Sequence, residues 1–175
     1  MTILAVLWLF LPAGIANMAP VLVNKIPLVN QWNTPMDFNA SWRGVRVFGP
    51  HKTWRGLLSG VVFASLFAAL QYFIYLPYVT SLAQAMLLGG LLGLGALLGD
   101  AIASFFKRQR RLPSGAPWVP VDQTDYIVGG LLVSYPLISS WLSIGGFIAI
   151  ILTYTGLHFL MSYIGYRLGF KSQPI

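Results

Sequence analysis

The chain has 175 residues, of which 57% are hydrophobic and 9% are charged, and its mean hydropathy is +0.72. This composition lies far outside that of soluble globular proteins and indicates a polytopic membrane protein. The absence of cysteine excludes disulfides, thiolate metal sites and cysteine nucleophiles. The formal net charge of +7 favours contact with phosphates or anionic lipid headgroups.

Five apolar runs have about the length that crosses a bilayer, roughly 18 to 20 residues. The first, Ile3–Val23, has no basic start and is longer than the apolar part of a signal peptide, so we expect a retained span. The others cover residues 57–76, 82–106, 126–142 and 144–166, and the last two are divided only near Ser143. The sequence therefore predicts an all-α fold, in which residues 1–175 form a single transmembrane domain of about five helices.

The basic residues fall on one side of this arrangement. They lie in a loop at about residues 24–56, in a second loop at about 107–125, and after the fifth span at Arg167 and Lys171, whereas the other two connections carry no charge. The positive-inside rule makes this side cytoplasmic. We therefore expect a multi-pass cell-membrane protein with its N-terminus outside, its C-terminus inside and its polar site facing the cytoplasm.

Closely spaced glycines occur in the third span. Small residues at this spacing let helix backbones approach one another. We expect Gly89, Gly90 and Gly93 to serve helix packing.

The acidic residues are four aspartates: Asp37 in the first loop, and Asp100, Asp122 and Asp125 around the second. A carboxylate at Asp100 costs a few kcal/mol in an apolar span, and the negative end of the helix dipole adds to that cost. A cation is therefore expected beside it. An ion pair with Lys107 or Arg108 is one explanation, and a bound divalent cation is the favoured one.

Asp122 and Asp125 are three residues apart at the start of the fourth span, so they share one face of a helix. Each alone could be a capping or first-turn acid. Together with Asp100 they predict an oxygen-rich metal site, for which Mg²⁺ is the favoured ion. Zinc is not expected, because His51 and His158 are widely separated and cysteine is absent.

Cations surround these acids. The stretch RVFGPHKTWRG (46–56) places Lys52, Thr53 and Arg55 beside glycines, although it lacks the Walker A spacing. The stretch SFFKRQRR (104–111) adds a second basic cluster, in which Arg110 and Arg111 are attributed to membrane anchoring. Carboxylates and cations gathered at the cytoplasmic ends of the spans predict a site for a polyphosphate and a phosphorylated lipid. Such a site indicates phosphoryl or nucleotidyl transfer.

Two segments carry a family resemblance: PMDFNASWRGVRVFGPHKTWRG (35–56) and GDAIASFFKRQRRLPSGAPWVPVDQTDYIVGG (99–130). Their motifs Asp-Phe, FGPxKTWRG, GDxxxSFxKR and PxDQxD, together with the ANMAP element of the first span, resemble the CDP-archaeol synthases, within the wider group of phosphatidate cytidylyltransferases. The resemblance covers nearly the whole chain. It implies Mg²⁺-dependent transfer of the cytidylyl group of CTP to an unsaturated archaeal ether lipid phosphate, giving CDP-archaeol and pyrophosphate.

The resemblance also implies roles for individual residues. Metal binding and catalysis fall to Asp100, Asp122 and Asp125, with Lys107 as a further catalytic residue. One departure from the pattern is the segment 112–120, with Pro117 and Trp118. Contacts to CTP or to phosphate are implied for Asn17, Asn24, Arg46, Lys52, Thr53, Arg55 and Arg108.

Two other functions fit less of the sequence. A CDP-alcohol phosphotransferase would need a DxxDG signature that is absent, and a small cation-linked transporter would place its charges nearer the midplane. Nucleic acid is not an expected partner, because the basic residues flank membrane spans. The lipid tails, the number of metal ions, the oligomeric state and the role of Asp37 stay open.

Overall fold

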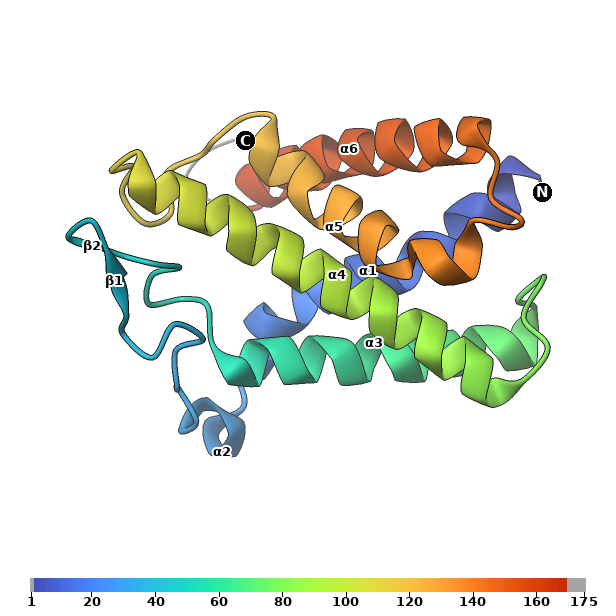
Figure 1. Ribbon diagram of the computed structural model, residues 1–175, viewed down its shortest axis with the longest axis horizontal. Helices are drawn as coiled ribbons and strands as arrows, with labels where there is room; N and C mark the ends of the chain where they lie inside the picture. The colour runs from blue at the N-terminus through green and yellow to red at the C-terminus, as the bar shows by residue number, and fades with distance from the viewer. Residues whose placement is uncertain (1, 170–175) are drawn as a thin grey trace.

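Five long helices run back and forth between two ends of the molecule in this computed structural model, which describes residues 2–169 (Figure 1). They are α1 (Ile3–Val23), α3 (Trp54–Ile74), α4 (Leu82–Gln109), α5 (Val121–Ile138) and α6 (Ile144–Arg167). The N-terminus, the α3–α4 connection and the α5–α6 connection lie at one end, and the two long loops lie at the other. The predicted all-α fold of about five helices is confirmed. Lys171 lies outside the described residues.

The helix ends differ from the predicted spans where a side chain or a charge sets the boundary. α3 begins three residues early because the Thr53 hydroxyl caps it, accepting a hydrogen bond from the backbone N–H of Gly56 at 3.2 Å. α4 continues past Phe106 and has Lys107 and Arg108 in its last turn. Their positive charges interact favourably with the negative end of the helix dipole. Ser143 caps α6 and separates it from α5, as expected.

Four helices within residues 2–169 are long and apolar enough to cross a membrane: α1, α3, α4 and α6. The fourth predicted span, 126–142, corresponds to α5, which begins and ends earlier than predicted. Its first turns are polar because they carry Asp122, Gln123, Thr124 and Asp125. α5 therefore has a polar start at the loop-bearing end and an apolar remainder.

Two prolines lie inside α1, and each leaves a carbonyl without its helical donor. Pro12 cannot donate to the carbonyl of Trp8, and the fully buried amide of Gln71 on α3 donates to that oxygen at 2.6 Å. The indole of Trp8 donates in turn to the carbonyl of Tyr75 at 2.7 Å. These bonds fasten α1 to the C-terminal half of α3.

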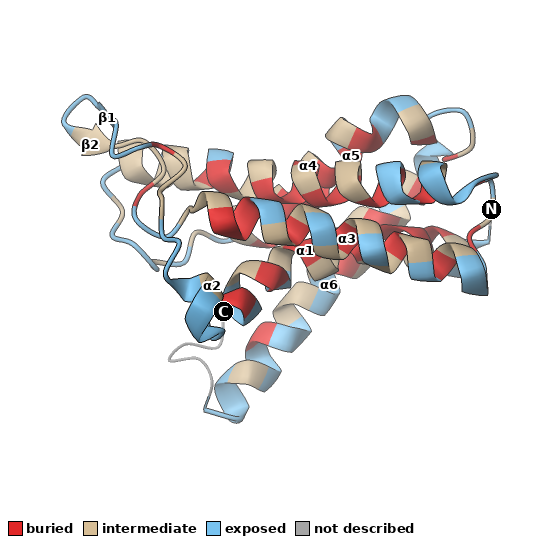
Figure 2. Ribbon diagram, turned by 90° about the horizontal axis from the view of Figure 1, so that it is seen from below, coloured by how far each residue is buried: buried red, intermediate tan, exposed pale blue. Residues whose placement is uncertain are grey.

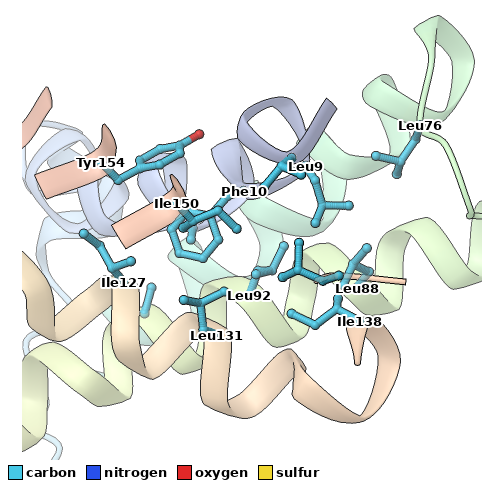
Figure 3. Packing of buried hydrophobic residues seen from close by; sticks show 14 of the residues in the cluster. Leu9, Phe10, Leu76, Leu88, Leu92, Ile127, Leu131, Ile138, Ile150 and Tyr154 are labelled. Atoms are coloured by element: carbon cyan, nitrogen blue, oxygen red, sulfur yellow. The ribbon is translucent and has the colours of Figure 1, made fainter. Parts of the chain in front are cut away.

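The largest cluster of buried apolar side chains lies where α1, α4, α5 and α6 meet (Figure 3). Phe10 is fully buried and stands edge-on to Tyr154, at 4.9 Å between ring centroids. Figure 2 shows that buried residues concentrate on the facing sides of the helices, whereas little of α6 is buried. A second, smaller cluster joins α1, α3 and α4: Ala16, Leu57, Ala64 and Leu97.

α4 packs against α1, α3 and α5, and glycines set its distance to two of them. A Cβ at Gly89 would overlap the backbone of α3 at Ala64, which confirms the packing role predicted for this series. On the opposite side, a Cβ at Gly95 would overlap the carbonyl oxygen of Gly129, and one at Gly99 that of Asp125. The start of α5 is therefore pressed against α4 beside Asp100.

The long loop between α1 and α3 contains a short helix α2 (Pro27–Asn30) and a hairpin of β1 (Ser41–Trp42) and β2 (Val45–Arg46), neither of which was predicted. The hairpin turn consists of Arg43 and Gly44, both with positive φ, as a two-residue type I′ turn requires. This loop lies at the same end of the molecule as the loop between α4 and α5 (Figure 1).

Candidate active site

A pocket of about 220 Å³ opens at the loop-bearing end, between α1, the start of α3 and α4. Its apolar lining includes Leu57 and Leu97 of the smaller core cluster. Its polar lining brings together four residues predicted for the site, namely Asn17, Lys52, Thr53 and Asp100. These residues come from three separate parts of the chain.

The ammonium group of Lys52 forms an ion pair with the carboxylate of Asp100, and both side chains are more than two-thirds buried. Lys52 is held in place by its backbone, because its carbonyl accepts a hydrogen bond from Met36 N–H at 2.8 Å. The partner of Asp100 is thus a lysine from the first loop. The alternative explanation for Asp100, an ion pair with Lys107 or Arg108 on the same helix, does not match the structure.

Lys107 instead binds Asp122, with its Nζ atom 2.8 and 3.2 Å from the two carboxylate oxygens. Asp122 also accepts a hydrogen bond from the backbone N–H of Trp118 at 2.9 Å, which ties the 112–120 loop to α5. Asp122 is therefore not an N-cap; that position is Pro120, which makes no capping bond through its side chain. Asp122 joins the two motifs of the second loop.

Asp125 lies next to Asp100, since Gly99 contacts the carbonyl oxygen of Asp125. The negative charges of Asp100 and Asp122 both act on it. Within residues 2–169 no cation lies within ion-pair distance of the Asp125 carboxylate. Three aspartates and two lysines thus form one connected cluster, which carries an excess of one negative charge when every member is ionised.

The metal prediction can be compared with this cluster. No group of three His, Cys, Asp or Glu side chains in the described part of the chain is placed to hold a metal ion. Asp100 and Asp122 are each occupied by a lysine. The donors are carboxylate oxygens, which suit a hard divalent cation. The Mg²⁺ site stays a prediction, because Lys52 and Lys107 occupy two of its three predicted ligands in this structure.

Arg55 lies apart from this pocket. Arg55 is buried, with 6% of the residue exposed. Its guanidinium donates to Asn24 Oδ1 at 2.8 Å, and to the Asn30 side chain and the Val29 carbonyl at 3.3 Å each. These bonds fasten the end of α1 and helix α2 to the start of α3. In this structure Arg55 and Asn24 hold the loop, and their predicted contact with phosphate stays a prediction.

Arg46 also has a partner within the loop, because its guanidinium pairs with the buried carboxylate of Asp37 at 2.5 Å. Asp37 further accepts hydrogen bonds from the backbone N–H groups of Asn39, Phe48 and Gly49. Burial alone would raise the pKa of the Asp37 carboxyl. The hydrogen bonds from Arg46 and from the three N–H groups outweigh burial and hold that pKa below its ordinary value. Asp37 thus holds the hairpin loop together.

Arg108 donates to the carbonyl of Pro113 at 3.0 Å and lies against Gly49, so it bridges the two loops. His51 also lines the pocket of Lys52 and Asp100. The sequence predicted no role for it, since zinc was not expected. Its position next to Lys52 in the FGPHKT stretch was the available signal. Nothing in the sequence indicated that Trp118 would contact Asp122 through its backbone.

Known proteins resemble this chain over most of its length. The family model described as CarS-like, CDP-archaeol synthase, matches residues 1–175. The CDP-archaeol synthase of Thermococcus onnurineus is 40% identical over 168 residues, covering 95% of this chain and 94% of that protein. The CDP-archaeol synthase of Pyrococcus furiosus is 38% identical over 173 residues, covering 98% of each chain.

A solved structure is also similar. It is described as an intramembrane enzyme for archaeal membrane lipid biosynthesis, and it superposes with a TM-score of 0.77 at 29% identity. The match covers 91% of this chain and 94% of the other. The likeness thus extends over most of both chains. On the family model and on both relatives, the chain belongs to the CDP-archaeol synthase family.

Proposed function

We propose that this chain transfers the cytidylyl group of CTP to the phosphate of an unsaturated archaeal ether lipid, giving CDP-archaeol and pyrophosphate. Family membership supports a CTP-dependent cytidylyltransferase of lipid biosynthesis. The observation that carries the proposal to a site is the meeting of Lys52 with Asp100. The FGPxKTWRG and GDxxxSFxKR motifs converge there on one pocket, at the mouth of a membrane-spanning bundle.

The proposed chemistry needs no protein nucleophile. An oxygen of the lipid phosphate attacks the α-phosphorus of CTP; the new P–O bond forms as the bond to the β-phosphate oxygen breaks, and pyrophosphate leaves. A phosphate monoester has its second pKa near 6, so it is largely dianionic at neutral pH and needs no general base. Catalysis then depends on positioning and on neutralising charge.

Lys52 and Lys107 supply that neutralisation in the proposed mechanism. Each is more than three-quarters buried and paired with an aspartate, so each charge is oriented before substrate arrives. Asn17 adds an amide to the pocket wall and can orient a phosphate or a ribose hydroxyl. Asp100, Asp122 and Asp125 are the residues that would hold Mg²⁺. When bound, that ion would offset phosphate charge and favour departure of pyrophosphate.

The proposal places this site on the cytoplasmic face. Every Lys and Arg within residues 2–169 belongs to the loops or helix ends at the loop-bearing end, and the connections at the other end carry none. The positive-inside rule assigns such an end to the cytoplasm, where CTP is available.

The test uses purified protein in a neutral detergent with Mg²⁺ and a panel of lipid phosphates that differ in ether linkage and tail saturation. CTP labelled at the α-phosphorus should pass its label to the lipid, and CTP labelled at the γ-phosphorus should pass its label to pyrophosphate. Transfer of the γ-label to lipid would identify a lipid kinase and contradict the proposal.

Asp100→Asn and Lys25→Ala serve as the test variant and its control. Asparagine keeps the size of Asp100 but removes the charge that pairs with Lys52, so label transfer should fall by about a hundredfold or more. Lys25 is exposed at the end of α1 and outside the pocket, so its removal should leave turnover within about twofold. Normal turnover in Asp100→Asn would remove this pocket from the proposal.

A further inference from the structure

A second pocket lies on another flank of α4 and shares no lining residue with the Lys52 pocket. Its volume is about 410 Å³, and it is formed between the hairpin of the first loop and the last turns of α4. Trp42, Arg43 and Val45 line it from the hairpin. The proposed function leaves this pocket without a role.

The charges of this pocket suit an anion. Arg43 and Arg111 both line it, and no Asp is among its lining residues. Within residues 2–169 neither arginine has a carboxylate at ion-pair distance. The side-chain Nε2 of Gln109, also a lining residue, is buried and has no hydrogen-bond acceptor. The guanidinium groups of Arg43 and Arg111 thus line one space that holds no carboxylate, and the Gln109 amide stands unpaired in the same wall. A phosphate offers oxygens to donors of this kind.

The two arginines that line the pocket, Arg43 and Arg111, also have an uncommon backbone conformation. Arg43 has a φ of 53° and Arg111 a φ of 58°, in the left-handed region that side-chain-bearing residues rarely adopt. Arg110, which follows the same basic run, stacks on Trp118 at 4.6 Å and does not line the pocket. The sequence assigned both Arg110 and Arg111 to membrane anchoring. In the structure Arg111 lines the pocket and Arg110 does not.

The rest of the pocket is apolar and continues onto the outside of the bundle. Phe105 and Phe106 form its helical wall. Phe106 is 50% exposed, and Ile102, one turn earlier on α4, is 55% exposed. These two residues lie four apart, so they share a face of a membrane-spanning helix below the arginines. A cationic pocket next to an exposed apolar surface matches a phosphorylated lipid, which has both a phosphate and a hydrocarbon chain. A free nucleotide has no hydrocarbon chain to cover Ile102 and Phe106.

We propose that this pocket binds the phosphate of a membrane lipid, with the hydrocarbon chain of the lipid lying against Ile102 and Phe106. It is a second lipid site, separate from the Lys52 pocket, and it stands whether or not the chain transfers cytidylyl groups. The hairpin is anchored by Asp37, so Trp42 and Arg43 are held over the end of α4 before a lipid arrives. Trp42 is exposed, as an aromatic residue at a membrane interface commonly is.

The test uses a local reporter because a lipid phosphate can also enter the other pocket. The chain has no cysteine, so Ser41→Cys can carry one environment-sensitive dye next to Trp42 and outside the lining. Titration is done in neutral detergent without Mg²⁺, and each probe is added alone. The probes are a short-chain dialkylglycerol phosphate, the same dialkylglycerol without phosphate, inorganic phosphate, and CTP.

We expect the dialkylglycerol phosphate to give a saturable signal and the neutral dialkylglycerol to give none. Arg43→Ala combined with Arg111→Ala should weaken this binding by about tenfold or more, and Lys25→Ala should leave it unchanged. Gln109→Leu, which leaves the hairpin intact, should also weaken it, and Phe106→Ala should weaken the lipid but not inorganic phosphate. Thermal unfolding verifies that each variant is folded.

Two results would overturn the proposal. Inorganic phosphate or CTP binding as tightly as the lipid phosphate would assign the pocket to a soluble anion. Unchanged lipid binding in both the double arginine variant and Gln109→Leu would remove the pocket as the binding site. Turnover is measured separately, so a failure of cytidylyl transfer leaves this titration interpretable.

Discussion

At the scale of single residues, the motifs divide into groups that act on substrate and groups that hold the loops. Lys52 and Arg55 are three positions apart in one motif, yet Lys52 faces a pocket and Arg55 turns toward Asn24 and the loop. Asp37 and Asp100 are both carboxylates paired with a cation, yet Asp37 also accepts three backbone N–H groups. Residue type alone does not distinguish these roles; the geometry of the partners does.

Lys52 and Arg55 should therefore respond to substitution in different measurements. Lys52→Ala should weaken CTP binding by roughly 2 to 5 kcal/mol, because a desolvated phosphate contact is lost. Its thermal unfolding in detergent should change little. Arg55→Ala should leave the KM for CTP nearly unchanged but lower stability by about 2 kcal/mol, because three part-buried hydrogen bonds from a charged donor are lost. Equal losses of CTP affinity at unchanged stability would place Arg55 in the substrate site.

Asp37 predicts a dependence of loop order on pH. Its folded-state pKa lies below the ordinary value, so the unfolded state binds more protons and stability rises with pH in that range. The stabilisation is complete above about pH 4 and is lost as the pH falls through the folded-state pKa. Hydrogen exchange at the Phe48 and Gly49 amides should accelerate in acid relative to the loop-free end of the bundle.

Asp37→Asn is the control for this titration. Its exchange at the same amides should be fast at neutral pH, because the amide group cannot accept from every donor around the carboxylate. That exchange should carry no extra acid dependence beyond the intrinsic chemistry. An acid transition that persists in Asp37→Asn would assign it to another group.

At the scale of elements, α4 organises the molecule. Glycines on one side bring it against α3, and Gly95 and Gly99 on the other bring it against α5. Because Gly99 precedes Asp100 and contacts the backbone of Asp125, the spacing of these two helices also sets the spacing of the carboxylates. Helix packing and site geometry are therefore one feature of α4.

Gly99→Ala tests this coupling. A methyl group there would overlap the carbonyl oxygen of Asp125, and overpacking of this kind costs about 1 to 3 kcal/mol. We expect lower thermal stability and a loss of turnover larger than the stability loss explains, because Asp125 moves relative to Asp100. Turnover is compared at a temperature where the variant is fully folded.

Gly156→Ala is the matched control, because a Cβ there meets no atom within 4 Å. Alanine is the better helix former by up to about 1 kcal/mol, so this variant should be as stable as the parent or more so. Equal behaviour of the two alanine variants would show that the α4–α5 contact does not position the aspartates.

At the scale of the whole molecule, the chain is a multi-pass membrane protein whose charged residues gather at one end of the bundle. The other end has short, uncharged connections. Five alternating helices place the N-terminus and the end of α6 at opposite ends (Figure 1). The same arrangement puts both motif-bearing loops together, so one face of the membrane receives the whole polar site.

The orientation in the membrane can be measured with single cysteines in a chain that has none. Ser140→Cys lies in the α5–α6 connection and Ser114→Cys in the α4–α5 loop, and both positions are exposed. An impermeant thiol reagent added to intact cells should label Cys at position 140 and should label position 114 only after lysis. Labelling of position 114 in intact cells would reverse the proposed orientation.

The sequence by itself determined the number of long helices and the approximate bounds of most, because bilayer-length apolar runs leave few alternatives. The one-sided distribution of charged residues also located the polar end of the molecule. The polar motifs, in their order and spacing, indicated the family. The sequence missed the hairpin, because two strands of two residues each have no periodicity to detect. It placed α5 several residues late, because apolar composition marks the apolar part of a helix and not its polar first turns.

The tertiary structure alone decided which charges meet. Lys52 and Asp100 are 48 positions apart, and only the packing of the first loop on α4 brings them together. The sequence placed the nearest cations of Asp100 on its own helix, where Lys107 is engaged by Asp122. The same packing turned Arg55 and Arg46 inward to hold the loop and set Arg43 and Arg111 around a second pocket. An ion pair depends on distance in space, and for residues in long loops sequence spacing carries no information about that distance.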